Sequence, residues 1–357
     1  MRTSFPAVDS LIAALRAALR DEGHAWTDVR LERLRDKGLA HDHVRLVGTG
    51  ALARIPKQSQ LQLGAIDNLA YQATCFERAS AAGHAPRLLG LLAPSEHLPR
   101  GALLVEEIVG RSAVLPDDLG AIMRALAALH SLAVPRNSER APILDAADPL
   151  QALLDEIAAQ AGHLPAAGVE AAVRRRVETE LARLHVTCAR CDRPPRHLIA
   201  FDGHPGNFMV RADGRAVLVD LEKCRYSYPG LDLAHATLYT STTWDLDTHA
   251  VLDLPTVLQA YSCWTDAMDP VAAGAALQWH VHLRRAMWLW SITWCAKWRA
   301  VSGAAARVSA DGEDWSAERS HAGLVAHVRN RVDHYLSRGV VEKALDEFDA
   351  LDGMLHA

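Results

Sequence analysis

The order of apolar and polar positions divides the chain into a part with short strands and a longer part with helices. Between about residues 43 and 110 the apolar runs are short and bounded by Gly or Pro, as in β-strands. The first two runs, in HVRLVGTGALARIPK, flank Gly48, Thr49 and Gly50, which predicts a hairpin. A helical stretch, AIDNLAYQATCFERASAAG, and two more strands, in PRLLGLLA and GALLVEEIVG, complete this part.

Helical periodicity dominates the chain beyond Gly110. In PDDLGAIMRALAALHSL the apolar residues recur at helical spacing, and we expect Asp117 and Asp118 in the first turn of this helix, where carboxylates are favourable. Further helical patterns lie at 150–161, at 168–185 and over most of 255–355. The pattern therefore predicts an α+β protein with a small β-rich lobe followed by a larger, mainly helical lobe.

One segment interrupts the helical part, FDGHPGNFMVRADGRAVLVDLEK at 201–223, in which FMV and AVLV flank a turn and predict a second hairpin. Asp202 and Asn207 would lie on the loop that enters this hairpin and Asp220 at its end, so the three side chains would meet on one side. Carboxylate and amide oxygens suit Mg²⁺ rather than zinc, and a carboxylate outside the metal can accept a hydroxyl proton. These are the groups that phosphoryl transfer requires.

Other polar residues of this region have simpler interpretations. His204 is expected to hydrogen-bond or pack within its loop, and Asp232 to brace the loop from the start of a helix. Glu222 fits either a position near the metal or a solvated face. These residues therefore add no catalytic group to the three above.

Composition sets the broad class. The 357 residues include 50% hydrophobic and 23% charged residues, which is typical of a globular protein of two domains or lobes. The formal net charge of −5 gives no basic excess for nucleic acid, and no apolar run approaches the roughly 20 residues that span a bilayer. The first residues lack the apolar core of a signal peptide. We expect a soluble, cytoplasmic protein without nucleic-acid or membrane partners; the sequence carries no signal for an oligomeric state.

Two of the six cysteines, Cys188 and Cys191, lie between His185 and His197, a spacing that can bind zinc. His185 ends a predicted helix, however, and the two prolines before His197 favour an extended segment. We therefore expect a loop with reduced thiols.

The segment 201–223 resembles the Asp-x-x-x-x-Asn catalytic loop and downstream metal-binding Asp of the aminoglycoside phosphotransferase and choline kinase-like families, small-molecule kinases with the protein-kinase-like fold. The match runs in order over roughly 45–240, and HPGN and the DLA at 232–234 favour these families over the protein kinases. The resemblance implies a two-lobed kinase fold. Residues 1–105 would form the nucleotide-binding lobe with a leading helix, and residues 106–357 the catalytic and acceptor-binding lobe.

The resemblance also implies roles in catalysis. Asp202 would be the catalytic residue that orients or deprotonates the acceptor hydroxyl. Asn207 and Asp220 would hold Mg²⁺ on the β- and γ-phosphates. The sequence departs from the family at Ala200, where a histidine that positions the loop is common.

For the nucleotide, ATP or GTP, the resemblance places Arg54 on the α- and β-phosphates, with Lys57 as a second candidate. Gly48 and Gly50 would let the hairpin lie over the phosphates. The adenine would be bound by the backbone near the residues of the hinge, which are Glu106 and Ile108. The family often has a helix Glu to pair with the strand cation; here Gln72 and Glu77 are the nearest matches, so we expect Arg54 to lack a salt bridge.

A tryptophan-rich segment, WHVHLRRAMWLWSITWCAKWRA, offers an acceptor site. Trp290, Trp294 and Trp298 recur every four residues and share one helix face, which is most simply explained by core packing. The alternative is an aromatic wall on which a substrate ammonium could sit, with Asp245 adding negative charge. Trp290, Trp294 and Asp245 are therefore the candidate acceptor residues.

These observations lead to one hypothesis and two alternatives. We expect a Mg²⁺-dependent phosphotransferase, a small-molecule kinase that moves the γ-phosphate of ATP or GTP to a hydroxyl of an amine-bearing metabolite or antibiotic. The alternatives are a non-catalytic nucleotide-binding pseudokinase and a metal-dependent phosphoesterase. The phosphoesterase would use as metal ligands Asp202, His204, Asp220, Glu222 and His235.

Overall fold

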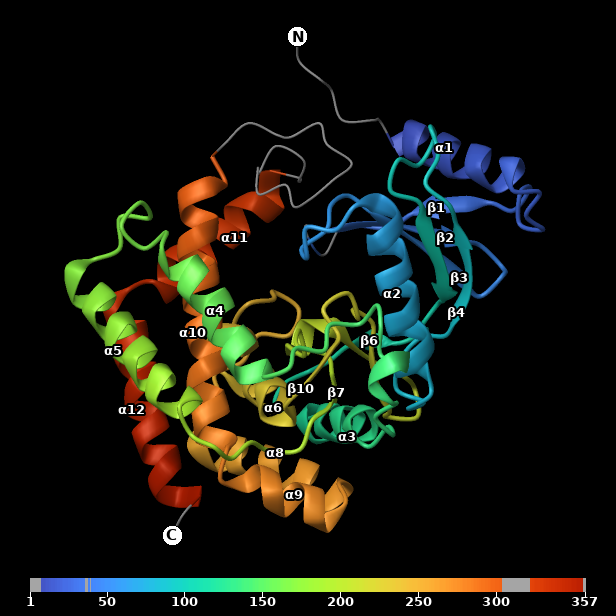
Figure 1. Ribbon diagram of the computed structural model, residues 1–357. Helices are drawn as coiled ribbons and strands as arrows, with labels where there is room; N and C mark the ends of the chain where they lie inside the picture. Colours follow the sequence, from blue (N-terminus) through green and yellow to red (C-terminus); the bar gives the residue numbers. More distant parts are fainter. Residues whose placement is uncertain (1–7, 36–37, 39, 304–321, 356–357) are drawn as a thin grey trace.

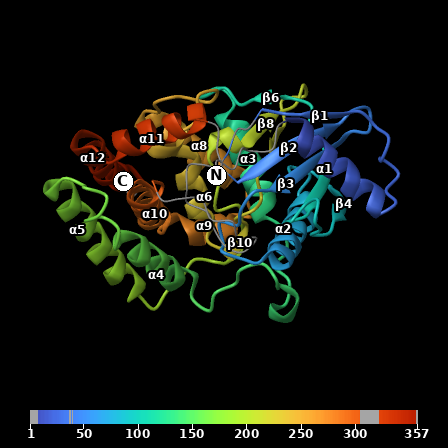
Figure 2. The same ribbon diagram turned by 90° about the horizontal axis from the view of Figure 1, so that it is seen from above.

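The computed structural model describes residues 8–35, 38, 40–303 and 322–355 (Figure 1). The part of the predicted helical region at 304–321 lies outside the described residues. Two parts lie side by side, one around a β-sheet and one made mainly of helices (Figures 1 and 2).

The first part is built on an antiparallel sheet of five strands in the order β1-β2-β3-β5-β4. The strands are β1 (Leu31–Arg33), β2 (His41–Leu46), β3 (Ala51–Pro56), β4 (Leu88–Leu92) and β5 (Ala102–Glu106). The predicted hairpin is confirmed as β2 and β3, and Gly48 and Gly50 adopt positive φ angles of 85° and 70° that favour glycine.

Two helices cover opposite faces of this sheet, α1 (Val8–Asp21) and α2 (Ala65–Ser80). Successive side chains of a strand point to opposite faces. Accordingly, Leu104 of β5 packs in a core with α1, while Leu103 and Val105 pack in a core with α2. Arg54 is paired with Leu103 in register, so its side chain also extends toward α2.

Helices form most of the second part (Figure 1). They are α3 (Leu119–His130), α4 (Pro149–Ala161), α5 (Ala171–Cys188), α6 (Pro229–Thr237), α7 (Tyr239–Thr242), α8 (Leu254–Ala267), α9 (Pro270–Leu277), α10 (His280–Val301), α11 (Ala322–Tyr335) and α12 (Arg338–Leu355), with short 3-10 turns η1 (Asn137–Glu139) and η2 (Pro205–Asn207). The long helix α10 is central, because α4, α5, α6, α11 and α12 all pack against it.

Short strands inside the helical part hold the predicted catalytic segment. They are β6 (Arg111–Ser112), β7 (His197–Ile199), β8 (Phe208–Val210), β9 (Ala216–Leu218) and β10 (Arg225–Ser227). The predicted second hairpin is confirmed as β8 and β9. In addition, β7 pairs with β10, and these strands lie directly before and after the segment 201–223. The segment is thus clamped at both ends, and its middle forms the β8–β9 hairpin.

The start of α3 differs from the prediction. Asp118 precedes the helix, and its carboxylate accepts a hydrogen bond from the Val114 backbone N–H at 2.7 Å and pairs with Arg111. The two carboxylates are therefore not in the first turn of α3, because Asp118 closes the preceding turn instead.

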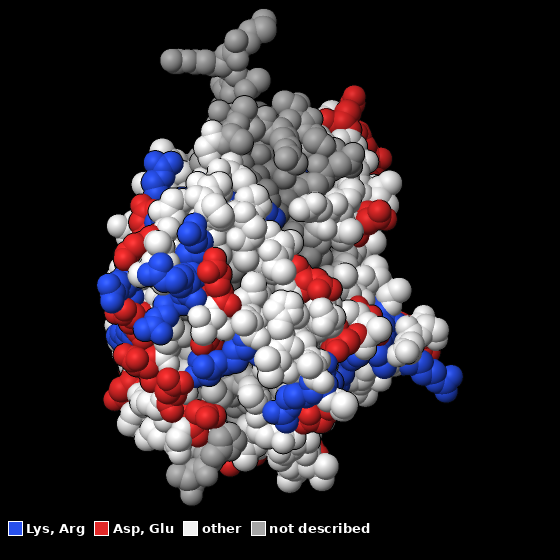
Figure 3. Space-filling model, turned by 60° about the vertical axis from the view of Figure 1, so that its left-hand side comes forward, with Lys and Arg blue, Asp and Glu red and all other residues white. Residues whose placement is uncertain are grey.

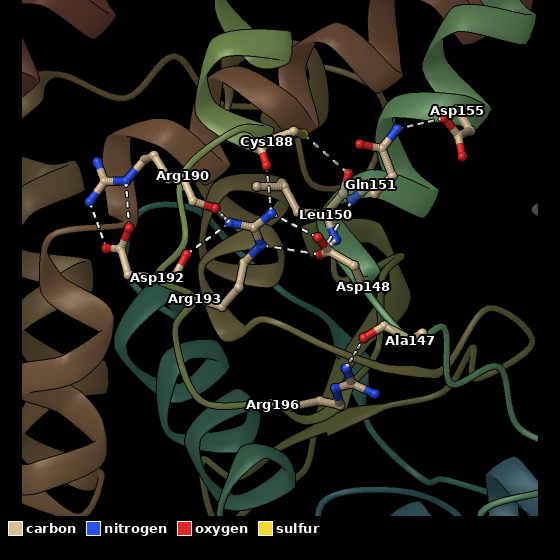
Figure 4. A network of polar contacts seen from close by, with 10 residues as sticks. All are labelled: Ala147, Asp148, Leu150, Gln151, Asp155, Cys188, Arg190, Asp192, Arg193 and Arg196. Atoms are coloured by element: carbon tan, nitrogen blue, oxygen red, sulfur yellow. Dashed lines mark hydrogen bonds and ion pairs between the residues drawn. The ribbon is translucent and has the colours of Figure 1, made fainter.

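Arginine side chains close the loop that follows α5 (Figure 4). Arg193 forms a bidentate pair with Asp148, the N-cap of α4, at 2.7 and 3.2 Å. It also donates to the carbonyl oxygens of Cys188 and Arg190 at 2.7 and 2.6 Å. Burial raises the pKa of the Cys188 thiol to about 11, and Cys191 is exposed. These contacts fix the loop with charged groups and backbone oxygens.

The surface on the side of α4 and α5 carries Lys and Arg intermixed with Asp and Glu (Figure 3). Pairs such as Arg174 and Glu178, 3.6 Å apart, account for part of this mixture. Among the described helices, none combines the length and the apolar character that crossing a membrane requires.

A buried ion pair fastens the C-terminal helix to the centre of the helical part. Arg284 of α10 is fully buried; its Nε donates to Glu347 of α12 at 3.0 Å, and its Nη1 donates to the Tyr261 hydroxyl at 3.3 Å. Burial acts to lower the pKa of Arg284, but Tyr261 and Glu347 raise it above its usual range, so the guanidinium stays charged.

Replacing Arg284 with Ala should therefore strongly destabilise the fold. The change leaves Glu347 without its cation, and breaking a buried pair in this way costs about 3–5 kcal/mol of unfolding free energy. Chemical denaturation followed by circular dichroism measures the loss. The control is Arg338→Ala, because the pair of Arg338 with Glu342 is solvent-exposed and its loss should leave the midpoint unchanged. Equal midpoints for both variants would contradict this role of Arg284.

Candidate active site

The loop that carries Asp202 is positioned by a buried carboxylate. Asp232, in the first turn of α6, accepts hydrogen bonds from the backbone N–H groups of Ala200 and Phe201, both at 2.7 Å. His130 Nε2 lies 3.0 Å from the same carboxylate, and Trp264 Nε1 donates to the other ring nitrogen of His130 at 3.0 Å. The Trp264 bond leaves the His130 proton on Nε2, so Asp232 accepts from three donors and braces the loop as expected.

The contact with Asp232 also explains how the loop is positioned although Ala200 stands where the families that the segment resembles commonly have a histidine. The missing family histidine would have positioned the loop, and here Asp232 holds the Ala200 N–H directly. A histidine from α6 also reaches the loop, because His235 Nδ1 lies 3.2 Å from the Phe201 carbonyl oxygen. Phe201 has a positive φ of 60°, an uncommon conformation that turns the chain sharply just before Asp202.

Asp202 projects from this turn into a group of charged and polar side chains. Its Oδ2 accepts a hydrogen bond from Lys223 Nζ at 2.7 Å, and its Oδ1 lies 3.7 Å from His235 Nδ1. Burial acts to raise the pKa of Asp202, but the Lys223 ammonium, followed by His204 and His235, outweighs it and lowers that pKa below its usual range. Burial also lowers the pKa of His235 to about 4, so this ring is neutral at pH 7. Asp202 is therefore an ionised carboxylate.

Two oxygen donors for a metal lie beside Asp202. Asn207 Nδ2 donates to the Asp202 carbonyl oxygen at 2.8 Å, which leaves the amide oxygen Oδ1 for a ligand. The Val219 N–H donates to the Asn207 carbonyl oxygen at 2.9 Å, so the next residue, Asp220, lies close to Asn207. One carboxylate and one amide oxygen fit Mg²⁺, which usually takes few protein ligands and completes its octahedron with phosphate oxygens and water.

Arg54 pairs across the two parts of the molecule, contrary to the prediction that it lacks a salt bridge. Its guanidinium donates to Asp220 Oδ1 at 2.8 Å and to the Val219 carbonyl oxygen at 2.9 Å. Burial acts to raise the pKa of Asp220, but Arg54 and then His41 lower it. The expected helix partner is absent because Gln72 instead bonds His41 Nε2 at 3.0 Å.

The other residues predicted to pair with Arg54, to bind phosphate or to lie near the metal have different surroundings. Glu77 is exposed on α2, and Lys57 Nζ lies 4.0 Å from Asp42 of β2. Glu222 is buried and accepts from Gln60 Nε2 at 2.7 Å. Burial and the neighbouring Asp220 raise the pKa of Glu222 to about 8, so at neutral pH it is mainly a protonated carboxyl and a poor metal ligand.

The hinge between the two parts provides open backbone groups. The Glu106 N–H donates to the Arg87 carbonyl oxygen at 2.9 Å, and its carboxylate pairs with Arg211 at 2.8 Å. Ile108 is buried, and within the described chain its backbone N–H and C=O form no hydrogen bond. Only the second of the two predicted hinge residues therefore has both backbone groups available to a base.

Trp290 lies behind the catalytic loop. Its ring meets Phe201 edge-on with centroids 5.2 Å apart, Lys223 Nζ lies 5.4 Å from its centroid, and its Nε1 donates to Glu156 of α4 at 2.6 Å. The side chain is buried, so the face expected to receive a substrate ammonium already holds Lys223. Trp298 is also buried in the helical core.

Trp294 and Asp245 lie at a different edge of the loop. Trp294 is partly exposed and meets Trp244 edge-on at 5.8 Å, and Trp244 stacks with Tyr335 at 6.2 Å. Asp245 touches the catalytic loop, because a Cβ on Gly206 would come within 2.8 Å of its Oδ2. This contact requires glycine at position 206 and places Asp245, next to Trp244 in the chain, against the catalytic loop.

Sequence reasoning missed Lys223 and Trp244, and it named His235 only as a metal ligand of the phosphoesterase alternative, whereas His235 Nδ1 lies 3.7 Å from Asp202 Oδ1. Lys223 ends the predicted catalytic segment 201–223, and the sequence feature that could have identified it is its position close to Asp220 and Glu222. Among the described residues, no group of three or more His, Cys, Asp or Glu side chains is placed to hold a metal ion.

Comparison with solved structures shows which fold this arrangement belongs to. An ethanolamine kinase from Plasmodium vivax has a TM-score of 0.63 at 10% identity, with 96% of this chain and 93% of that chain covered. A macrolide 2'-phosphotransferase from Brachybacterium faecium has a TM-score of 0.54 at 15% identity, covering 82% and 94%. The GDP complex of aminoglycoside 2'-phosphotransferase-IIIa has a TM-score of 0.59 at 12% identity, covering 93% and 97%.

These likenesses show the protein-kinase-like fold of small-molecule kinases, with a small β-rich lobe and a larger helical lobe. No curated protein matches the chain in sequence. The family model described as the phosphotransferase enzyme family matches residues 33–273, which is more than half of the 357 residues. The chain therefore belongs to the phosphotransferase enzyme family, to which the predicted resemblance pointed.

Proposed function

We propose that this protein transfers the γ-phosphoryl group of ATP or GTP, with Mg²⁺, to a hydroxyl group of a small molecule that carries an amine. The observation that carries the proposal is the meeting of Asp202, Asn207 and Asp220 at one end of the β8–β9 hairpin, with Arg54 reaching them from β3. Ionised carboxylates, a metal-binding amide and a phosphate-binding cation are the parts that phosphoryl transfer uses.

In this proposal each residue has one task. Asp202 accepts a hydrogen bond from the acceptor hydroxyl and takes its proton as that oxygen bonds to the γ-phosphorus. The bond from the γ-phosphorus to the oxygen bridging it to the β-phosphate breaks, and ADP or GDP leaves. Asn207 Oδ1 and Asp220 hold Mg²⁺, which when bound neutralises charge on the phosphate oxygens. Arg54 moves from Asp220 to the α- and β-phosphates, where its planar guanidinium can bind two oxygens. Gly48 and Gly50 shape the turn that lies over the phosphates, and Lys57 stays a second candidate for them.

The base of the nucleotide is assigned to the hinge. The open backbone N–H and C=O of Ile108 offer one donor and one acceptor, which suit the edge of a purine. The N–H of Glu106 is already bonded to the Arg87 carbonyl oxygen, so Glu106 ends strand β5 beside the base without donating to it. A neighbour of the same fold was solved with GDP, so we keep both ATP and GTP as donors.

The acceptor site is assigned to Trp294, Trp244 and Asp245. Indole faces attract ammonium groups, and a nearby carboxylate favours the same charge. Trp290, by contrast, supports the loop from behind. Solved neighbours with ethanolamine, macrolide or aminoglycoside in their names differ in acceptor, so the acceptor must be argued from these side chains.

The alternatives receive less support. A phosphoesterase with a two-metal centre needs a cluster of ligands, whereas Glu222 bonds Gln60 and His235 lies against the backbone of Phe201. A non-catalytic nucleotide-binding protein has no need for Asp202, which is kept ionised and held by the braced loop. The described site therefore favours an enzyme.

Asp202→Ala should reduce acceptor-dependent release of ADP or GDP by about 10²–10⁴-fold, the usual contribution of a positioned base, with the KM for nucleotide unchanged. The assay screens amino alcohols, amino sugars, aminoglycosides and hydroxy amino acids with Mg²⁺. The control is Asp213→Ala, because Asp213 is exposed in the turn of the same hairpin. Wild-type rates in the Asp202 variant would refute its catalytic role.

Mg²⁺ alone should raise the melting temperature little, whereas Mg²⁺ with ATP or GTP should raise it clearly. In the structure Arg54 pairs with Asp220 and Lys223 with Asp202, so each carboxylate already has a cation beside it. Stabilisation depends on how tightly the native state binds its ligand. Thermal unfolding with EDTA, Mg²⁺, nucleotide and both together tests this, and strong stabilisation by Mg²⁺ alone would contradict it.

Trp294→Leu and Asp245→Asn should each raise the KM for an amine acceptor about 5- to 30-fold, because such contacts contribute about 1–2 kcal/mol. The KM for nucleotide should not change. Asp266→Asn, an exposed change on α8, is the matched control. If acceptors with and without an amine respond alike, the charge preference assigned to this site is wrong.

A further inference from the structure

Lys223 is a buried lysine among the groups of the active site. It is 9% exposed, and its Nζ lies 2.7 Å from Asp202 Oδ2. Across the residues that the structure describes, Asp202 is the only carboxylate in an ion pair with Lys223. Burial acts to lower the pKa of Lys223, but Asp202 and then Glu222 raise it, so the side chain stays an ammonium. A buried cation that faces the predicted base calls for a functional explanation.

The Lys223 ammonium lies over the indole ring of Trp290, with Nζ 5.4 Å from the ring centroid. The indole is itself fixed, because its Nε1 donates to Glu156 at 2.6 Å and its ring meets Phe201 at 5.2 Å. Arg225 completes the arrangement by pairing with Glu156 at 3.2 Å and lying 3.5 Å from the Phe201 ring. The Lys223 ammonium is thus held against Trp290 of α10, and Trp290 is held by Glu156 of α4 and Phe201 of the catalytic loop.

The pair with Lys223 leaves the two oxygens of Asp202 unequal. Oδ2 is bonded to the ammonium, while Oδ1 accepts no hydrogen bond within the described chain and lies 3.7 Å from His235 Nδ1. A carboxylate with one oxygen fixed cannot rotate freely about its terminal bond, so the direction of its other oxygen is also fixed. The free oxygen is the one that an acceptor hydroxyl can bond.

We propose that Lys223 is a positioning residue for phosphoryl transfer: its ammonium, seated on Trp290, fixes Oδ2 of Asp202 and thereby aims Oδ1 at the acceptor hydroxyl. The proposal rests on the proposed function. Lys223 acts through Asp202 and leaves nucleotide binding to Arg54, Asn207 and Asp220. Its loss should accordingly lower kcat and spare the KM for nucleotide.

The first test compares Lys223→Met with Lys223→Arg in the acceptor-dependent assay. The Met variant should lose about 10²-fold in kcat, the effect of misplacing a catalytic group by about 1 Å. The Arg variant, which keeps a cation, should recover most of this loss. Lys343→Met is the matched control, because Lys343 Nζ also lies over an aromatic ring, 4.6 Å from the centroid of Tyr239, but outside the site. A Met variant with wild-type kcat overturns the proposal.

A double-mutant cycle separates positioning from direct contact with the phosphoryl group. If Lys223 acts through Asp202, Lys223→Met should cause no further loss in an Asp202→Asn background, because residues that act as a unit are not additive. If the two losses multiply, Lys223 acts independently and the proposal is overturned.

Variants of Trp290 test the same proposal without changing Lys223. They are needed if the Lys223→Met variant does not fold. Trp290→Phe and Trp290→Leu both lose the hydrogen bond of Trp290 Nε1 to Glu156, but Phe keeps an aromatic ring beneath the Lys223 ammonium and Leu does not. Trp290→Phe should therefore keep a higher kcat than Trp290→Leu, whose kcat should fall toward that of Lys223→Met. Equal kcat for Phe and Leu overturns the proposal. Nucleotide-induced stabilisation of each variant shows that it is folded and binds substrate.

Failure of the two proposals looks different. A wild type that phosphorylates no acceptor refutes the proposed function and with it any role of Lys223 in transfer. An active wild type whose Lys223→Met variant is equally active refutes only the role of Lys223.

Discussion

Two backbone N–H groups, those of Ala200 and Phe201, donate to one buried carboxylate, and the rest of the site depends on this pair of bonds. The carboxylate of Asp232 has no Lys or Arg partner in the described chain; His130 provides its third hydrogen bond. Such bonds compensate the burial of the charge. They also stabilise the left-handed conformation of Phe201, which costs about 1–3 kcal/mol on its own. Asp202 points into the site because this turn is held.

Each carboxylate that the proposed chemistry uses is paired with its own cation. Lys223 pairs with Asp202 within the helical lobe, and Arg54 reaches from the β-rich lobe to Asp220. The second pair joins the lobes at the hairpin that carries the proposed metal ligands. Both carboxylates would carry an uncompensated charge in a partly buried place without these partners, which is unfavourable. The charge of each of these two carboxylates is therefore balanced by a cation of the protein itself.

The sequence predicted the parts of the fold whose periodicity extends over many residues. The β2–β3 and β8–β9 hairpins and the helices α2 to α5 were expected, and so was the meeting of Asp202, Asn207 and Asp220. The strands β6, β7 and β10 were not expected, because runs of two or three residues show no alternation. The strands β8 and β9 are as short, but the turn residues between them predicted their hairpin. Pairing between β7 and β10 is decided by the tertiary structure.

Side-chain partners were harder to predict, for a related reason. Arg54 and Asp220 are 166 positions apart, and no local pattern indicates that the lobes bring them together. The spacing of the tryptophans correctly predicted that they share one helix face. The same spacing is compatible with contact to a substrate and with contact to the catalytic loop, so it could not predict their partners. Trp290 meets the loop and Lys223, whereas Trp294 meets Trp244 at a partly exposed edge.

The groups assigned to chemistry and those assigned to the acceptor come from different stretches of chain. Asp202, Asn207, Asp220 and Lys223 all lie in one continuous segment at 201–223, clamped by β7 and β10. The residues assigned to the acceptor lie after α7 and on α10. A mutation of Trp244, Asp245 or Trp294 would change what is bound while the four reacting groups keep their contacts. Such a division lets a lineage acquire a new acceptor by a few substitutions while phosphoryl transfer continues to work.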